Sequence, residues 1–273
     1  MSGYVRWAGL VVAMGCASVA NAQPNLVLVI LDDIGVDRIG AYGYGTAGPT
    51  PTIDGLAAQG VRFASFWAQP TCSPFRASVL TGLAPSEHGI GSPIELDNPE
   101  KSTGLDPDID TLPKRLRAAG YRTELVGKWH LAGEPGYTTQ HPLLAGFDHH
   151  RGMMFNPGYL GGDYTNYEKC IDGACAMLAN APYLTTDTTN DAIAALAGNE
   201  PFFLWIGYNA AHGPRHAPPA SLHGYGPLDC TPLAQQATCH KAMIEALDTE
   251  LARLLAAADL SDTTVVVVSD TGT

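Results

Sequence analysis

Three carboxylates stand at the ends of apolar segments that are typical of buried strands. Asp32 and Asp33 close the segment NLVLVILDD (25–33), and Asp270 closes TTVVVVSD (263–270). Parallel strands present their carboxyl ends at one edge of a sheet, so these side chains should meet there. Adjacent carboxylates repel each other unless a cation compensates. Because their ligand atoms are all oxygen, they favour a hard divalent ion, Ca²⁺ or Mg²⁺.

The remaining candidates follow three further predicted strands: Cys72 and Arg76 follow 61–69, Lys128 and His130 follow 121–130, and His212 follows 200–209. One polar residue after a strand is usually a helix cap or a turn residue. Five such strand ends at one edge of a sheet are hard to explain as caps. Acids that hold a metal, beside cations that hold an anion, describe a site for a sulfuryl or phosphoryl group.

The other cysteines leave Cys72 without a partner. Cys170 and Cys175 lie together in CIDGAC, and Cys230 and Cys239 flank TPLAQQAT. Two short-loop disulfides are the simplest account in an oxidising compartment, with pairing across the two groups as an alternative. A zinc site of four cysteines is less favoured, because neither pair has C-x2-C spacing. An odd thiol in an exported protein requires an explanation.

The N-terminus has the pattern of a secretory signal peptide over residues 1–22. Arg6 precedes a short apolar run, and Ala20 and Ala22 occupy the small-residue positions of a cleavage site. The run is too short to span a bilayer comfortably. A lipoprotein attached through Cys16 is a less favoured alternative. We therefore expect a periplasmic or secreted protein that has no membrane segment after signal cleavage.

Composition bounds the class of protein. The chain has 273 residues, of which 45% are hydrophobic, enough for one large α/β domain or two small ones. The formal net charge is -12. This argues against nucleic acid as a partner, because phosphate neutralisation needs clustered lysine and arginine.

Predicted helices alternate with the predicted strands along most of the chain. The helices are expected at 50–60, 73–82, 110–120, 185–199 and 233–260. This alternation predicts an α/β fold with a mostly parallel central sheet flanked by helices. Residues 131–182 have little periodicity and are expected to form long loops. The substrate pocket is expected in irregular loops between residues 83 and 230.

Several motifs together resemble the sulfatase family of the alkaline phosphatase superfamily. CSPFR (72–76), followed by LTG (80–82), matches the signature Cys or Ser, any residue, Pro, any residue, Arg, then Thr-Gly. GYRTELVGKWH (120–130) resembles the second signature. Matches to PNLVLVILDD, AHGPRHAPP and SDTG follow the order of the family. Together these motifs extend over residues 24–272.

The resemblance implies an alkaline phosphatase-like core and a role for each site residue. A maturation enzyme would oxidise Cys72 to formylglycine, whose hydrate attacks sulfur with one hydroxyl and expels sulfate with the other. The family's metal ligands map to Asp32, Asp33, Cys72, Asp270 and Thr271. The family's other active-site roles map to Arg76, which steadies the diol, His130, which orients it, and Lys128 and His212, which bind the sulfate. The substrate would be a small-molecule or carbohydrate sulfate ester.

Departures from the family pattern leave alternatives open. Thr271 stands where the family usually has an asparagine ligand, and Phe75 replaces a small residue. Family members continue into further strands and a C-terminal antiparallel subdomain. Residues 23–273 are therefore expected to be an N-terminal catalytic domain, truncated at its C-terminal end. A phosphodiesterase or phosphonate monoester hydrolase, or an inactive sulfatase-like domain, are the alternative functions.

Overall fold

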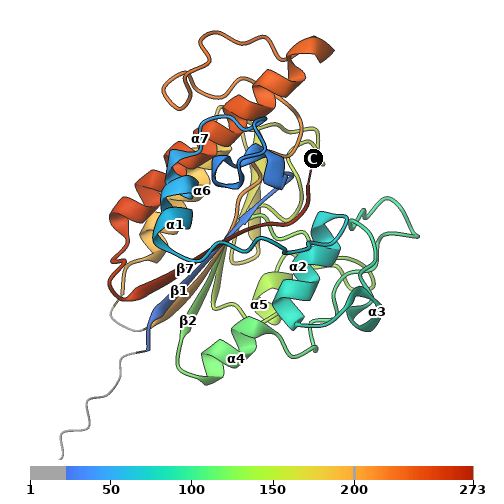
Figure 1. Ribbon diagram of the computed structural model, residues 1–273. Helices are drawn as coiled ribbons and strands as arrows, with labels where there is room; N and C mark the ends of the chain where they lie inside the picture. The colour runs from blue at the N-terminus through green and yellow to red at the C-terminus, as the bar shows by residue number, and fades with distance from the viewer. Residues whose placement is uncertain (1–22, 199–200, 273) are drawn as a thin grey trace, which may run out of the picture.

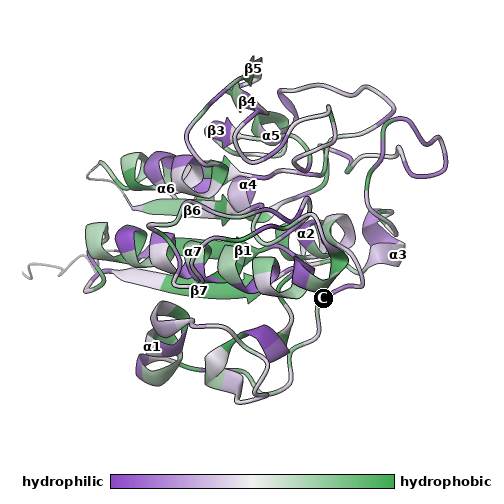
Figure 2. Ribbon diagram, turned by 90° about the horizontal axis from the view of Figure 1, so that it is seen from above, coloured by the Kyte–Doolittle hydropathy of each residue, from purple (hydrophilic) through white to green (hydrophobic). Residues whose placement is uncertain are grey.

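A seven-stranded sheet forms the centre of the molecule. The computed structural model describes residues 23–198 and 201–272, and the predicted signal peptide lies outside these residues. The spatial order of the strands is β5-β4-β3-β2-β6-β1-β7, and Figure 2 shows the strands that it labels in this succession from β5 to β7. Their bounds are β1 Asn25–Leu31, β2 Arg122–Gly127, β3 His149–Gly152, β4 Tyr167–Ile171, β5 Ala174–Leu178, β6 Phe202–Gly207 and β7 Thr263–Ser269.

Helices cover both faces of this sheet. Side chains of α1, α6 and α7 pack on one face, and side chains of α2 and α4 pack on the other, with α5 beside them (Figure 1). Their bounds are α1 Pro51–Gln59, α2 Cys72–Thr81, α3 Pro85–His88, α4 Leu112–Ala118, α5 His141–Leu144, α6 Leu184–Ala195 and α7 Gln236–Ala257, with 3-10 turns at Val36–Arg38, Gly40–Tyr42 and Leu233–Gln235. In the part of the chain that the structure describes, no helix has the length and apolar character needed to cross a bilayer.

Strand β1 lies inside the sheet and is apolar on both faces. Val29 contacts the core under α6 and α7, whereas its neighbour Ile30 contacts the core under α2. The continuous apolar run therefore has the physical basis expected of a central parallel strand. Strands β6 and β1 are in the hydrophobic colours of Figure 2, and the helices carry both kinds of residue.

The predicted α/β architecture is confirmed, with small shifts in the element bounds. Strands β3, β2, β6, β1 and β7 are mutually parallel, and β4 and β5 form an antiparallel extension. Helix α6 ends at Ala195, before the predicted end at residue 199, which lies outside the described residues. Helix α7 is shorter at both ends than the predicted segment 233–260.

The predicted strand at 61–69 is wrong. This segment has no strand pairing and crosses the surface between α1 and α2. Val61 and Trp67 are 83% and 91% exposed. The alternation of apolar residues here has no neighbouring strand to pair with and no core to face, so it does not produce a strand.

The prediction that residues 131–182 form only loops is also wrong. The segment contains α5 and three strands, β3, β4 and β5. Strands β4 and β5 form a hairpin that turns at Asp172 and Gly173, both with positive φ. Asp-Gly is a strong hairpin signal, because both residues tolerate the left-handed region.

Both short-loop disulfides are confirmed. Cys170 and Cys175 are directly opposite each other in the β4-β5 hairpin and are bonded. Cys230 is bonded to Cys239 in the first turn of α7. Among the described residues Cys72 is a free thiol, and it is buried.

Candidate active site

The parallel register of β1 and β7 brings three carboxylates together. Leu31 of β1 is paired with Ser269 of β7, so Asp32 and Asp270 leave the sheet at the same level. Asp32, Asp33 and Asp270 each offer an oxygen within 4.8 Å of the others. Asp32 and Asp270 are fully buried, and Asp33 is partly exposed.

Two buried cations contact the carboxylates. Lys128, just after β2, places its Nζ 2.5 Å from Asp32 Oδ2. Arg76 donates from Nε and Nη2 to Asp270 Oδ2 at 3.0 and 2.9 Å, and from Nη1 to the Lys128 carbonyl at 2.9 Å. Gly207 at the end of β6 makes room, since a Cβ there would lie 2.8 Å from Arg76 Nη1. All four charged side chains are excluded from solvent.

These charges shift the pKa values of the two buried acids in opposite directions. Burial would raise the pKa of Asp32, but Lys128 and Arg76 outweigh burial and lower it. Burial and the negative charge of Asp32 raise the pKa of Asp270 to about 7, despite its contact with Arg76. The two cations therefore stabilise Asp32 as an anion but leave Asp270 short of positive charge.

The donor set fits a hard divalent cation. Asp32 Oδ1 and Asp270 Oδ1 are buried and have no hydrogen-bond partner within residues 23–198 and 201–272. Buried carboxylate oxygens rarely remain unpaired, and a cation bound by them is one of the ordinary explanations. Thr271 donates from Oγ1 to Asp33 Oδ1 at 3.1 Å, so its hydroxyl lies beside the carboxylates. Oxygen ligands of this kind suit Ca²⁺ or Mg²⁺.

Cys72 lies beside the carboxylates and contacts His130. It is the first residue of α2, and its Sγ lies 3.2 Å from His130 Nδ1. His130 Nε2 lies 3.1 Å from the Ile94 carbonyl oxygen, which can only accept, so Nε2 donates and Nδ1 accepts from the thiol. Burial raises the pKa of the Cys72 thiol, whereas burial, Lys128 and Arg76 hold the pKa of His130 well below its usual value. The pair is therefore a neutral thiol and a neutral imidazole.

Cys72 and Arg76 reach the site from a helix and not from a strand end. The helix predicted over 73–82 is confirmed as α2, which begins one residue earlier and carries both side chains, whereas the strand expected before it at 61–69 is absent from the described residues. Residues four apart lie on the same helix face, so both side chains point to the same region. Leu80 and Ala77 pack into the core and hold α2 against the sheet edge. The spacing in CSPFR is thus a helical spacing.

Two site residues have unusual backbone conformations. Asp33 and His130 have φ values of 56° and 61°, in the left-handed region. Non-glycine residues pay about 1 kcal/mol or more there, and such residues cluster at functional sites. The strain indicates that the fold holds these two side chains in specific orientations.

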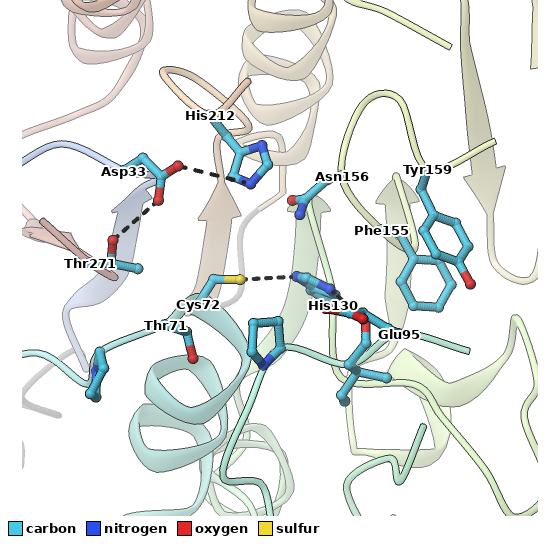
Figure 3. Close-up of a pocket in the computed structure, with 13 residues that line it drawn as sticks. Asp33, Thr71, Cys72, Glu95, His130, Phe155, Asn156, Tyr159, His212 and Thr271 are labelled. Atoms are coloured by element: carbon cyan, nitrogen blue, oxygen red, sulfur yellow. Dashed lines mark hydrogen bonds and ion pairs between the residues drawn. The ribbon is translucent and has the colours of Figure 1, made fainter. Parts of the chain in front are cut away.

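A cavity of about 290 Å³ opens onto this cluster (Figure 3). Five of the predicted site residues line it: Asp33, Cys72, His130, His212 and Thr271. The other four predicted residues, Asp32, Arg76, Lys128 and Asp270, are buried and do not line it. In Figure 3, Asp33, Thr271 and His212 form one end of the cavity, Phe155, Tyr159 and Glu95 the other, and Cys72 lies between them.

The sequence predicted the region that contains the second end of the cavity, but it did not identify the individual residues there. Glu95, Phe155, Asn156 and Tyr159 line the cavity and lie in the region 83–230, where the pocket was expected. None of them belongs to a motif with a defined spacing. The cluster of aromatic, amide and glycine residues in MFNPGYL is a weak signal that could have identified three of them.

A family model described as Sulfatase matches residues 24–273. The chain belongs to the sulfatase family. The family membership predicted from the motifs is thus confirmed. The residues of these motifs in the sulfatase-family chain are those that meet at the edge of the sheet.

Curated relatives are similar over most of the chain. N-acetylgalactosamine-6-sulfatase of Homo sapiens is 33% identical over 225 residues, which cover 74% of this chain and 42% of that protein. Arylsulfatase of Klebsiella aerogenes is 30% identical over 226 residues, which cover 77% of this chain and 47% of that protein. The sulfatase-family chain therefore spans less than half the length of these relatives.

Solved structures share the fold. The crystal structure of Ps i-CgsB has a TM-score of 0.74 and 26% identity, and the match covers 91% of this chain and 58% of that chain. The PsFucS1 sulfatase from Pseudoalteromonas sp. has a TM-score of 0.67 and 24% identity, with 91% and 55% covered. The expected alkaline phosphatase-like sulfatase core is confirmed.

Proposed function

We propose that residues 23–273 carry the catalytic centre of a sulfatase that hydrolyses a sulfate ester. The observation that carries this proposal is the position of Cys72. It is the one described cysteine outside a disulfide, it contacts His130, and it opens onto a cavity beside three clustered carboxylates. In this proposal Cys72 is the precursor of formylglycine, and a maturation enzyme is the protein partner.

The proposed metal is Ca²⁺, with Mg²⁺ as the alternative, held by Asp32, Asp33, Asp270 and Thr271 with the modified Cys72. When bound, the metal offsets negative charge on the sulfuryl oxygens, and the formylglycine hydrate supplies the attacking hydroxyl. The free carboxylate oxygens and the clustering of the acids support this assignment.

The chain's other residues have proposed roles that follow from their contacts. Lys128 holds Asp32 and directs positive charge toward the sulfate. Arg76 fixes Asp270 by two hydrogen bonds and steadies the modified residue 72 from one turn along α2. His130, held by the Ile94 carbonyl, orients residue 72.

His212 has the proposed role of binding the sulfate and donating a proton to the leaving oxygen. It lines the cavity at the end that contains Asp33, and its Nε2 lies 3.9 Å from Asp33 Oδ2. Expelling an alkoxide is unfavourable in water-poor surroundings, so a positioned acid speeds this step.

The proposed location is the periplasm or the medium outside the cell. Two disulfides support an oxidising compartment. The proposed signal peptide at residues 1–22 would direct export, and the proposed substrate is a small-molecule or carbohydrate sulfate ester.

Paired substrates test the reaction class. We expect the matured protein to hydrolyse 4-nitrophenyl sulfate with a kcat/KM at least ~10-fold above that for bis(4-nitrophenyl) phosphate and 4-nitrophenyl phenylphosphonate, a barrier difference of about 1.4 kcal/mol. Steady-state release of 4-nitrophenol measures all three. A preference for either phosphorus ester would instead establish the phosphodiesterase or phosphonate hydrolase alternative.

Metal binding is tested through stability. We expect Ca²⁺ to raise the Tm of chelator-treated protein, because a ligand at 100 times its Kd stabilises the folded state by about 2.7 kcal/mol. Asp33→Asn should lose most of this shift, and it is chosen because Asp33, unlike Asp32, is not paired with a buried lysine. Scanning calorimetry measures both. Asp108→Asn, at an exposed carboxylate, is the control and should keep the full shift; an unchanged shift in Asp33→Asn would contradict the assignment.

A further inference from the structure

An aromatic wall forms the end of the cavity that faces away from the carboxylates. The rings of Phe155 and Tyr159 are stacked with centroids 4.5 Å apart and an interplanar angle of 28°, and Tyr137 also stacks with Phe155 at 6.0 Å. Tyr159 is held in place because its hydroxyl accepts a hydrogen bond from the Leu96 amide at 3.2 Å. Phe155 also meets the edge of His130 at 5.7 Å. The wall is therefore ordered and borders the Cys72-His130 pair.

Apart from His212 at the end that contains Asp33, the charged side chains on the cavity surface are acidic. Among the described residues that line the cavity there is no lysine or arginine, whereas Asp33 and Glu95 stand at its two ends. The nearby Lys101 does not line the cavity, and its Nζ is paired with Glu95 Oε1 at 2.9 Å. A second anionic group on a substrate would therefore meet a carboxylate or an apolar ring, and no free cation, at the aromatic end.

Asn156 supplies a polar contact between the two ends. It lines the cavity, and Figure 3 shows it between His212 and His130. Its Oδ1 is buried and has no hydrogen-bond partner in the described part of the chain. An unpaired buried amide oxygen is unfavourable, so a donor on a bound molecule would stabilise it.

We propose that this cavity selects a sulfate ester whose alcohol part is uncharged and presents a flat apolar face to Phe155 and Tyr159. This inference rests on the proposed sulfatase function and names the substrate class for the same site. Apolar faces gain by covering the two rings, and the Asn156 oxygen accepts from a hydroxyl or amide of the alcohol part. An ester with a second anion loses affinity, because that charge approaches the Glu95 carboxylate and meets no free cation at this end of the cavity.

Binding to an inactive variant tests the inference separately from catalysis. In Cys72→Ala, titration calorimetry would compare methyl 4-(sulfooxy)benzoate with 4-(sulfooxy)benzoate, and a methyl hexopyranoside monosulfate with the same glycoside carrying a second sulfate. In at least one pair, we expect the ester with an uncharged alcohol part to bind at least ~10-fold more tightly than the ester with a second negative charge. Binding of the benzoate pair would indicate an aryl substrate, and binding of the glycoside pair would indicate a sugar substrate. Equal or tighter binding of the charged members, or no binding by any of the four, would overturn the inference. Turnover by the wild-type protein judges the sulfatase proposal independently.

Variants of the wall and of Glu95 assign the selectivity to residues. Tyr159→Ala should raise KM for the ester with an uncharged alcohol part about 3- to 10-fold with little change in kcat. Tyr159→Phe keeps the ring but loses the hydrogen bond from the Leu96 amide, so its KM should lie between those of wild type and Tyr159→Ala. Glu95→Gln should improve kcat/KM for the ester with a charged alcohol part about 3- to 10-fold more than it changes kcat/KM for the ester with an uncharged alcohol part. Glu100 is an exposed acid outside the cavity, so Glu100→Gln should leave kcat/KM for both esters unchanged. If Glu95→Gln unfolds at the same temperature as wild type and leaves the ratio of the two kcat/KM values unchanged, the proposed role of the aromatic end of the cavity is refuted.

Discussion

Cys72→Ala should abolish sulfate-ester hydrolysis, with a loss of about four orders of magnitude or more in kcat. The proposed nucleophile derives from this side chain, whose Sγ lies 3.2 Å from His130 Nδ1. Steady-state turnover of an aryl sulfate by wild type and variant, both made with the maturation enzyme, measures the effect. Because alanine favours the helical conformation and the thiol is small, the fold should be retained.

The controls for Cys72 separate loss of chemistry from loss of structure. Thermal unfolding of Cys72→Ala should remain close to wild type. Peptide mass spectrometry across residues 69–82 should show an aldehyde in place of the thiol in active wild-type protein. Activity in the alanine variant, or an unmodified thiol in fully active protein, would refute the proposed mechanism.

Arg76→Ala should destabilise the protein by about 3–5 kcal/mol. The Arg76 guanidinium and the Asp270 carboxylate are both excluded from solvent and joined by two hydrogen bonds. Removal of Arg76 leaves the buried Asp270 either charged without its partner or forced to take up a proton, and either outcome is more costly than the loss of an exposed ion pair. Urea unfolding of metal-free protein, analysed with a two-state model, measures the change.

A matched surface pair provides the comparison for Arg76. Arg115 pairs with Asp110 at 2.9 Å, but both side chains are mostly exposed, so Arg115→Ala should cost less than ~1 kcal/mol. Arg76→Lys, which keeps the charge but not the fork of donors, should fall between the two arginine variants. It also keeps the prediction testable where Arg76→Ala does not fold. Equal effects of Arg76→Ala and Arg115→Ala would contradict the prediction.

The buried core of the fold was predictable because its signals are local. The run ending at Asp32 is apolar on both sides, and this pattern is produced by a strand covered on both faces. The run ending at Asp270 was expected to be buried in the same way, but β7 is an edge strand of the sheet and its Val266 is 49% exposed. The segment 61–69 has a similar hydrophobic content but is exposed, since strand formation also requires a neighbour in the sheet. The β4-β5 hairpin was missed although its Asp-Gly turn is a local signal.

The residues that gather at the site were also predictable, whereas their pairing was not. Residue types and motif spacing indicated the acids, the cations and the unpaired Cys72, because five short motifs preserve them along the chain. The motifs did not reveal that Lys128 and Arg76 would be fully buried, or that each would be engaged by a different carboxylate. Such pairings depend on which strands are adjacent, and sequence order does not state this.

By itself, the sequence identified the side chains that meet at this edge of the sheet: three acids, two cations, two histidines, one threonine and one unpaired cysteine. Only the tertiary structure decided their arrangement, because the order β2-β6-β1-β7 brings Lys128 and Asp270 to one edge from segments far apart in the chain. It also placed the wall of Phe155 and Tyr159 opposite the acids. Packing between distant loops sets the shape and charge of a pocket, and no local pattern encodes it.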